Sequence, residues 1–332
     1  MVRFSLSTLM LIVCALTPAG GGWAQDQPAD ETATPDDAAT GQPTRRPEYE
    51  LCYKFHAGEV LRTEIVHRAT VQTTIQGTSQ TAETLSKSVK RWVVDKVDAD
   101  YTVTFTHSVE SIDMWQKTQG RSEVRYNSAT DKDVPPGYEE AAEAVGVPLT
   151  VVTMTDRGEI IKRQEKRVQP VSMSTQMTIP LPNHPVSIGD SWSTPMDIDV
   201  VLANGVTKKI ETRQKFTLEK VSHEVATIAV DTQILTPIQD PAIEAQLIQR
   251  MSNGHVRFDI AAGRMLSQQL DLDRRVIGFS GPSSSMHYLT RFTETTLAAE
   301  VPVAEKQSPS DEVPMPQPPA KSAVRKKAKT VR

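Results

Sequence analysis

The feature of this chain that most constrains its fold is an alternation of apolar and polar side chains with a period of two. Successive side chains of a β-strand point to opposite faces of the sheet, so this period predicts strands with one face on a core. The alternating stretches are residues 61–75, 102–109, 226–234 and 266–276. The sequence therefore predicts a mainly β protein of long antiparallel strands, in a curved sheet or half-barrel with two short helices.

The predicted elements occur twice in the same order. The first unit begins at Gly58-Glu59 and the second at Gly189-Asp190, and each continues through a strand, a turn and two further strands. A short helix follows in both, after Pro135-Pro136 and after Asp240-Pro241, where an N-cap aspartate precedes a first-turn proline. We interpret this order as an internal duplication, with chance similarity of two β-rich stretches as the alternative. The pattern leaves open whether the units share one sheet or form two domains.

The N-terminus has the pattern of an export signal. Arg3 precedes an apolar run at residues 4–16, and small residues follow at Gly22 and Ala24. The run is too short for a membrane-spanning helix, which needs ~20 apolar residues, so we expect cleavage after Ala24. An uncleaved anchor and lipid attachment at Cys14 are the alternatives. Lipid attachment is disfavoured because a bulky valine precedes the cysteine.

Composition divides the chain beyond the signal at residues 1–24. Residues 25–46 form an acidic linker and residues 298–332 a tail rich in proline and lysine. Both have too few large apolar residues to offset chain entropy, so we expect disorder there. The folded part is predicted as a first β-rich repeat at residues 47–182 and a second at residues 183–297. Cys52 is the only cysteine left after cleavage, so no internal disulfide is expected.

The basic end of the tail is a candidate contact site. Lysine and arginine recur between Lys321 and Arg332, whereas the whole chain has a net charge of -4. A basic tail of this kind can touch an anionic envelope surface, and a solvated tail without a partner is the alternative. Export and the acidic net charge argue against nucleic acid as a partner.

The sequence has no motif of a known catalytic or cofactor chemistry. It lacks the paired histidines of a zinc helix, a phosphate-binding glycine loop and a dinucleotide fingerprint. We therefore expect no cofactor and no enzymatic activity. His67 and His107 are in phase with the apolar faces of their strands. They would line a cavity or hold a metal if they met across neighbouring strands, and they would otherwise be core histidines.

Methionine and aromatic residues are frequent among the predicted inward positions. Methionine adapts to irregular apolar ligands, and it also fills irregular cores. A curved sheet covered by helices can hold a lipid or another apolar ligand in such an interior, and dense packing of the same residues is the alternative. The candidate ligand-binding residues are His67, His107, Trp115, Tyr126, Met154 and Tyr288.

Several separated blocks resemble an uncharacterised family of secreted bacterial proteins. The blocks are residues 90–98, 102–105, 112–117, 121–127 and 146–148. The family has no established activity, so the resemblance implies no catalytic residue. The chain departs from the family pattern at Tyr101, because a glycine usually follows the Asp-x-Asp turn. The predicted fold is also similar to lipoprotein-carrier half-barrels, a likeness that does not establish function.

These features predict a periplasmic or secreted, non-enzymatic protein that binds an apolar ligand or a partner on a curved sheet. A structural or scaffolding protein that acts through its tails is the first alternative. A hydrolase or metal enzyme built around His67 and His107 is the second.

Overall fold

A computed structural model describes residues 46–167, 178–202 and 204–298 of the chain. The expected signal at residues 1–24, the acidic linker up to residue 45 and the tail from residue 299 onward lie outside the described residues. So do the basic segment Lys321–Arg332 and Ala203. None of the described helices is long and apolar enough to cross a bilayer.

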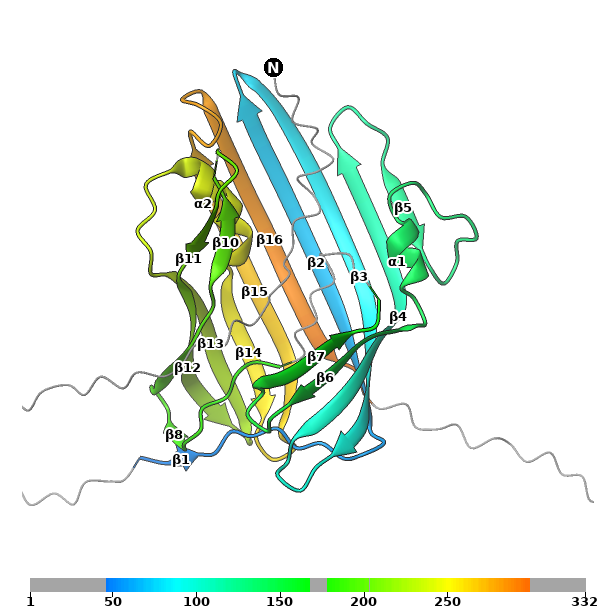
Figure 1. The fold of residues 1–332 in the computed structure, drawn as a ribbon, viewed down its shortest axis with the longest axis vertical. Coiled ribbons are helices and arrows are strands. Elements are labelled where there is room, and N and C mark those ends of the chain that lie inside the picture. Colours follow the sequence, from blue (N-terminus) through cyan, green and yellow to red (C-terminus); the bar gives the residue numbers. More distant parts are fainter. Residues whose placement is uncertain (1–45, 168–177, 203, 299–332) are drawn as a thin grey trace, which may run out of the picture. The chain divides into compact units, whose positions relative to one another are not determined.

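Twelve strands form one antiparallel sheet, which confirms the mainly β class (Figure 1). Their order is β7-β6-β4-β3-β2-β16-β15-β14-β13-β12-β9, with β5 beside β4. Two separate ribbons pair β1 with β8 and β10 with β11. The strands are β1 (Glu48–Tyr49), β2 (Val60–Ile75), β3 (Thr78–Val97), β4 (Val103–Thr118), β5 (Val124–Asn127), β6 (Pro148–Met154), β7 (Ile160–Glu165), β8 (Val186–Ser187), β9 (Ser191–Pro195), β10 (Ile198–Val201), β11 (Thr207–Ile210), β12 (Thr212–Ser222), β13 (Val225–Ile234), β14 (Asn253–Asp259), β15 (Arg264–Ile277) and β16 (Ser284–Thr296).

Strand β16 joins the two predicted units within this sheet. It pairs with β15 on one side and with β2 on the other, so the last described strand lies beside the first long one. The sequence left open whether the units share a sheet. They lie in one continuous sheet, and Figure 1 shows β15, β16, β2 and β3 side by side.

The sheet is curved, and the main hydrophobic core defines its inner face. Trp92 and Phe105 come from β3 and β4, whereas Phe216 and Leu218 come from β12, yet all four belong to one buried cluster. Strands so far apart in the sheet order can share a cluster only if the sheet curls with this face inside. Among the described strands, β7 and β9 are the edges and do not pair with each other, so the sheet is not a closed barrel.

The segment before β2 closes this core at one end of the long strands, which we call the core end. Leu51 and Tyr53 are buried in the cluster, and Phe55 packs against it. The Tyr53 hydroxyl donates to the carbonyl oxygen of Ile179 at 3.0 Å. Burial raises the pKa of Tyr53 far above its usual range, so the hydroxyl stays protonated and available as a donor.

The two helices pack at the sides of the inner face. The residues that flank α1 (Glu139–Glu143), Tyr138 and Ala144, are buried in a cluster with Ile112 of β4 and Tyr126 of β5. Helix α2 (Pro241–Leu247) begins at Asp240, whose carboxylate accepts a hydrogen bond from the Ala242 N–H at 2.9 Å. This confirms the predicted N-cap.

Helix α2 leads directly into a second helical turn. It ends at Leu247 and continues as a 3-10 turn, η2 (Ile248–Arg250). Ile248 lies in a buried cluster with Leu272 of β15 and Tyr288 of β16. The helical segment therefore covers the inner face of β15 and β16, while the α1 region covers that of β4.

One backbone motif occurs at equivalent places in the two predicted units. Val94 exchanges two hydrogen bonds with the Gly58-Glu59 pair, at 2.8 and 2.9 Å. Leu218 exchanges two with the Gly189-Asp190 pair, at 2.7 and 3.0 Å. An irregularity of register follows each of these strand residues. The repeated motif supports the internal duplication, which stays a prediction.

The turn between β3 and β4 keeps a left-handed residue without glycine. Tyr101, which stands where the family pattern has glycine, has a φ of 63° and a side chain that is 70% exposed. The bulky side chain therefore accepts the left-handed region, and its ring projects into solvent. The turn therefore has a positive φ although tyrosine replaces the glycine of the family pattern.

We expect alanine at Gly58 and at Gly189 to destabilise the protein by similar amounts. Their φ values are 82° and 97°, and a Cβ at either would meet nothing within 4 Å. The loss therefore comes from left-handed backbone alone, about 1–2 kcal/mol in the free energy of unfolding. Urea unfolding of each single variant measures it.

Gly254→Ala is the contrasting variant for this experiment. A Cβ at Gly254 would overlap the carbonyl oxygen of Gln269 on the neighbouring strand. Gly254→Ala should therefore lower the free energy of unfolding by more than alanine at Gly58 or at Gly189 does. If alanine destabilised the protein at only one of Gly58 and Gly189, the two turns would not be equivalent.

Candidate functional site

One cross-strand row of the inner face is only half-buried. Its residues stand directly opposite one another on β15, β16, β2, β3 and β4. We call them the open row: Leu270, Phe292, His67, Ser86 and Met114. Figure 1 shows the strands of this row between α2 on one side and α1 on the other. The row is thus a mixed apolar and polar surface whose ends touch buried clusters, Leu270 the main core and Met114 the α1-covered cluster.

Buried polar side chains lie on the inner face between the open row and the core end. Glu294 of β16 is two residues from Phe292 in that direction. Thr63 of β2 and Lys90 of β3 are direct cross-strand neighbours, and so are Trp92 of β3 and His107 of β4. We call these residues the polar belt: Glu294, Thr63, Lys90, Trp92 and His107. Glu294 is 1% exposed and His107 is 0% exposed.

Five polar atoms of the belt have no hydrogen-bond partner among the described residues. They are Oε2 of Glu294, Oγ1 of Thr63, Nε1 of Trp92 and both ring nitrogens of His107. The rings of Trp92 and His107 lie against each other, with centroids 4.3 Å apart. An unsatisfied buried polar group costs ~1–3 kcal/mol, so such a set would cost roughly 5–15 kcal/mol, as much as the stability of a typical domain. The belt therefore calls for polar partners, either water or part of a ligand.

Burial dominates the protonation of the belt. It raises the pKa of Glu294 to about 7, an effect that the Lys90 ammonium group partly offsets. It lowers the pKa of Lys90 to about 8, and the Glu294 carboxylate partly offsets that. The Thr63 hydroxyl lies close enough to oppose the rise at Glu294, although it falls short of hydrogen-bond geometry. Both side chains of this pair therefore change their protonation state close to neutral pH.

A second charge pair reaches the belt from β7. The Arg163 guanidinium group is 2.6 Å from the Glu165 carboxylate, and Glu165 accepts a hydrogen bond from the Thr150 hydroxyl at 3.1 Å. Burial lowers the pKa of His107 to about 3, and the charges of Lys90 and Arg163 contribute to this, so the imidazole is neutral. Among the described residues, the belt and its surroundings thus hold two basic and two acidic side chains, whose charges balance when Glu294 is ionised.

The two candidate histidines do not meet. His107 is opposite Trp92, which is opposite Leu61, and Leu61 is six residues from His67 along β2. At ~3.3 Å per residue, the histidines are offset by roughly 20 Å along the strands. His67 instead lies 2.8 Å from the Thr290 hydroxyl through Nε2, and burial lowers its pKa. This register excludes the cross-strand histidine pair that the sequence left open.

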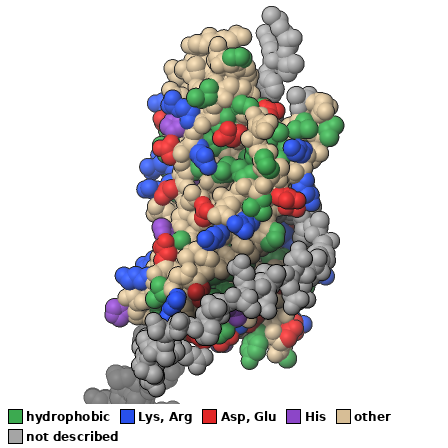
Figure 2. Space-filling model, turned by 90° about the vertical axis from the view of Figure 1, so that its left-hand side faces the viewer, with side chains coloured by type: hydrophobic (Ala, Val, Ile, Leu, Met, Phe, Trp, Pro, Cys, Tyr) green, Lys and Arg blue, Asp and Glu red, His purple; other side chains and the backbone are tan. Residues whose placement is uncertain are grey.

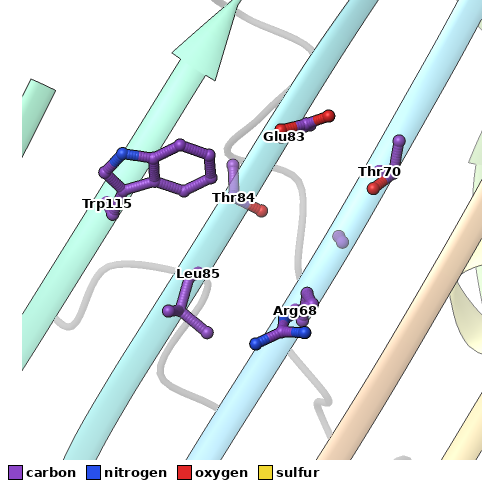
Figure 3. A pocket seen from close by; sticks show the side chains of 7 residues that line it. Arg68, Thr70, Glu83, Thr84, Leu85 and Trp115 are labelled. Carbon is purple, nitrogen blue, oxygen red and sulfur yellow. The ribbon is translucent and has the colours of Figure 1, made fainter. Parts of the chain in front are cut away.

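Trp115 lies on the outer face, away from the other candidates. The register between β3 and β4 shifts at Glu110, which is an extra residue on β4. Residues beyond the bulge therefore point to the face opposite to the one that the alternation up to Val109 implies. Trp115 lines an open depression of about 330 Å³ with Leu85 and Arg68 (Figure 3).

The remaining three candidates are distributed over three buried clusters. Tyr126 stacks on Tyr138 beside α1, with ring centroids 6.2 Å apart. Met154 belongs to the main core, where the Thr178 hydroxyl lies 3.8 Å from its sulfur. Tyr288 packs with the α2 region. Of the six candidates, His67 lies in the open row and His107 in the polar belt.

The outer face carries charges of both signs. Cross-strand ion pairs join Arg62 to Glu110 at 2.7 Å and Lys87 to Glu64 at 2.6 Å. Figure 2 shows basic and acidic side chains interspersed on one side of the molecule. Among the described residues no group of three or more His, Cys, Asp or Glu side chains is arranged to hold a metal ion.

Lys90 and Glu294 are not among the residues that the sequence predicts for a binding site. Lys90 is in phase with Trp92 and Val94 on β3, and Glu294 is in phase with Phe292 on β16. A signal was therefore present, because the same alternation that turns the apolar residues inward also turns these charged residues inward. Charged residues are rarely fully buried, so composition alone favours the outer face for both.

The chain is similar to a protein family without a known role. Residues 171–263 match the model of a family of unknown function (DUF6263). This confirms the expected likeness to an uncharacterised family, with the match in the second half of the chain. No curated protein matches the sequence.

Two solved structures are similar to part of the chain. One, titled for lipid–protein interactions in lipovitellin, has a TM-score of 0.42 and 11% identity, covering 74% of this chain and 26% of that chain. The chain thus spans about a quarter of that protein. A DUF1329 family protein from Desulfovibrio piger has a TM-score of 0.14 and 10% identity, covering 68% of this chain and 83% of that chain. Similarity at these TM-scores carries no argument about function.

We expect Glu294 to make the protein less stable as the pH rises from about 4.5 to about 7. The pKa of its carboxyl group is 4.5 in the unfolded chain and about 7 in the folded protein, so the folded state holds more protons in this window. The stabilisation is fully present below the lower value and is lost through the upper one. The loss is about 3 kcal/mol in the free energy of unfolding.

Urea unfolding at pH values from about 4.5 to about 7.5 measures this loss across the expected window. Glu294→Gln should remove the dependence, and Glu83→Gln, on the outer face, should keep it. An unchanged pH slope in Glu294→Gln would contradict the assignment.

Proposed function

We propose that this chain is a non-enzymatic, exported envelope protein that binds an apolar ligand on the inner face of its curved sheet. The observation that carries the proposal is the open row. Leu270, Phe292 and Met114 are apolar and only partly buried; Leu270 and Met114 lie at the edges of two buried clusters, and Phe292 between them belongs to none of the clusters of the described residues. Covering such side chains with an acyl chain removes apolar surface from water, at about 25 cal/mol per Å².

Small side chains on β3 support the same proposal. Ala82, Thr84, Ser86 and Ser88 follow one another on its inner face. They lie on the strand between the α2-covered cluster and the α1-covered cluster and belong to neither. Trp92, at the core end of the same strand, is by contrast a member of the main buried cluster.

Two hairpin tips beyond the open row are uncharged. Residues 69–82, which form the tip of the β2–β3 hairpin, and residues 276–286, at the β15–β16 turn, contain no Asp, Glu, Lys or Arg. The two tips are neighbours, because Ser284 pairs with Ile75. An apolar ligand that reaches the open row from this end therefore passes no charged side chain of these segments.

The rival functions have less support. An enzyme built around His67 and His107 needs them together, and their offset of roughly 20 Å along the strands opposes that. Scaffolding through the tails, including Lys321–Arg332, rests on segments outside the described residues. Neither is favoured by a specific contact within the part that the structure describes.

We expect Ser86→Phe to weaken binding of a fluorescently labelled long-chain fatty acid by about tenfold or more, equivalent to about 1.4 kcal/mol. The added ring would stand on the inner face in the middle of the open row. Leu85→Phe is the matched control, because the adjacent Leu85 points to the outer face beside Trp115. Fluorescence titration measures both variants.

Equal binding by the two variants would contradict the inner face as the site. Native mass spectrometry of protein purified from its own envelope should also show a bound lipid-sized mass. Protein that is consistently free of such a mass and takes up no labelled fatty acid would refute the proposed function.

A further inference from the structure

Beyond an apolar ligand in general, the polar belt points to the chemistry of one end of that ligand. The inference rests on the proposed function. The belt begins one cross-strand row from the open row, since Glu294 is two residues from Phe292 and its partner Ile65 is two from His67. An acyl chain lying on the open row therefore has its end near Glu294, Thr63 and Lys90, the part of the belt that is closest to the row.

The unpartnered atoms of the belt require both donors and acceptors. Nε1 of Trp92 is a donor, and Oε2 of Glu294 is an acceptor when ionised. His107, being neutral, offers one ring nitrogen of each kind, and the Thr63 hydroxyl can do either. A carboxylate or phosphate group only accepts, so it would leave an ionised Glu294 unsatisfied. A hydroxyl group both donates and accepts, and it satisfies either kind of atom.

Charge leads to the same class of head group. The belt has Lys90 close to Glu294, and the neighbouring Arg163 is paired with Glu165 at 2.6 Å. When Glu294 is ionised, these two basic and two acidic side chains leave no excess positive charge to bind an anion. An anionic head group would also meet the buried carboxylate of Glu294, from which it is repelled when both are ionised.

We infer that the end of the polar belt formed by Glu294, Thr63 and Lys90 binds an uncharged, hydroxyl-bearing head group of an amphiphile, with its acyl chain on the open row. A monoacylglycerol has this chemistry, because it joins a single acyl chain through an ester to a glycerol that keeps its other hydroxyl groups. The occupant that competes with this assignment is water alone, which also donates and accepts.

The test compares the binding of three probes, which have hydrocarbon chains of the same length, to the full mature protein. They are 1-oleoylglycerol, oleate and 1-octadecene, each titrated by displacement of a labelled fatty acid. We expect the glycerol ester to bind about tenfold more tightly than oleate or the alkene, from the hydrogen bonds that only its head group supplies. Equal affinities would overturn the inference and leave the proposed function standing, because the chain alone would then determine binding. Failure of all three to bind would refute both.

The variant that tests the residues is the double substitution Lys90→Met with Glu294→Leu. It removes both charges together and leaves neither member of the pair as an uncompensated buried charge, so the fold should be kept. We expect the preference for the glycerol ester to fall to within about twofold of the alkene. Thr295→Leu, on the outer face beside Glu294, should keep the full preference. A folded double variant that retains the preference would overturn the assignment to the belt.

Discussion

The pairing of β16 with β2 is the interaction on which the rest of the structure depends. Among the described strands of the large sheet, it is the one link between the first predicted unit and the second. The paired residues run from Thr63 to Ile75 and from Ser284 to Thr296, so the link extends over almost the whole length of β2. It brings Glu294 close to Thr63 and Lys90, which are far from it along the chain. The polar belt exists because of this long-range pairing.

Burying the belt works against stability. Two ionisable side chains, Lys90 and Glu294, are taken out of water, and their mutual attraction offsets only part of the desolvation. A well-packed apolar pair of similar volume is often equal or better in stability. Polar groups that reduce stability in this way are typical of functional sites, where a ligand supplies what the protein lacks.

Much of the architecture can be predicted from local sequence. The period of two predicts the long strands, and Asp240 with Pro241 predicts the start of α2. What local sequence does not contain is register between distant strands. The extra residue at Glu110 reverses the face of Trp115, and the pairing of β16 with β2 decides that Glu294 lies near Lys90. Both depend on how strands align, which periodicity within one strand does not specify.

Side-chain size along β3 accounts for the difference between the two ends of the sheet. Toward the core end its inner face carries Trp92 and Val94, which join the residues of β12 and β13 in one buried cluster. Toward the other end it carries Ser86 and Ser88, which belong to none of the buried clusters. The backbone is the same continuous strand throughout, so volume and polarity at alternate positions decide which part of the strand joins a buried cluster. Lys90 of the belt lies between Ser88 and Trp92, where the inner face of β3 passes from small to large side chains. In the proposed function, the apolar chain of the ligand joins its polar end at this same place.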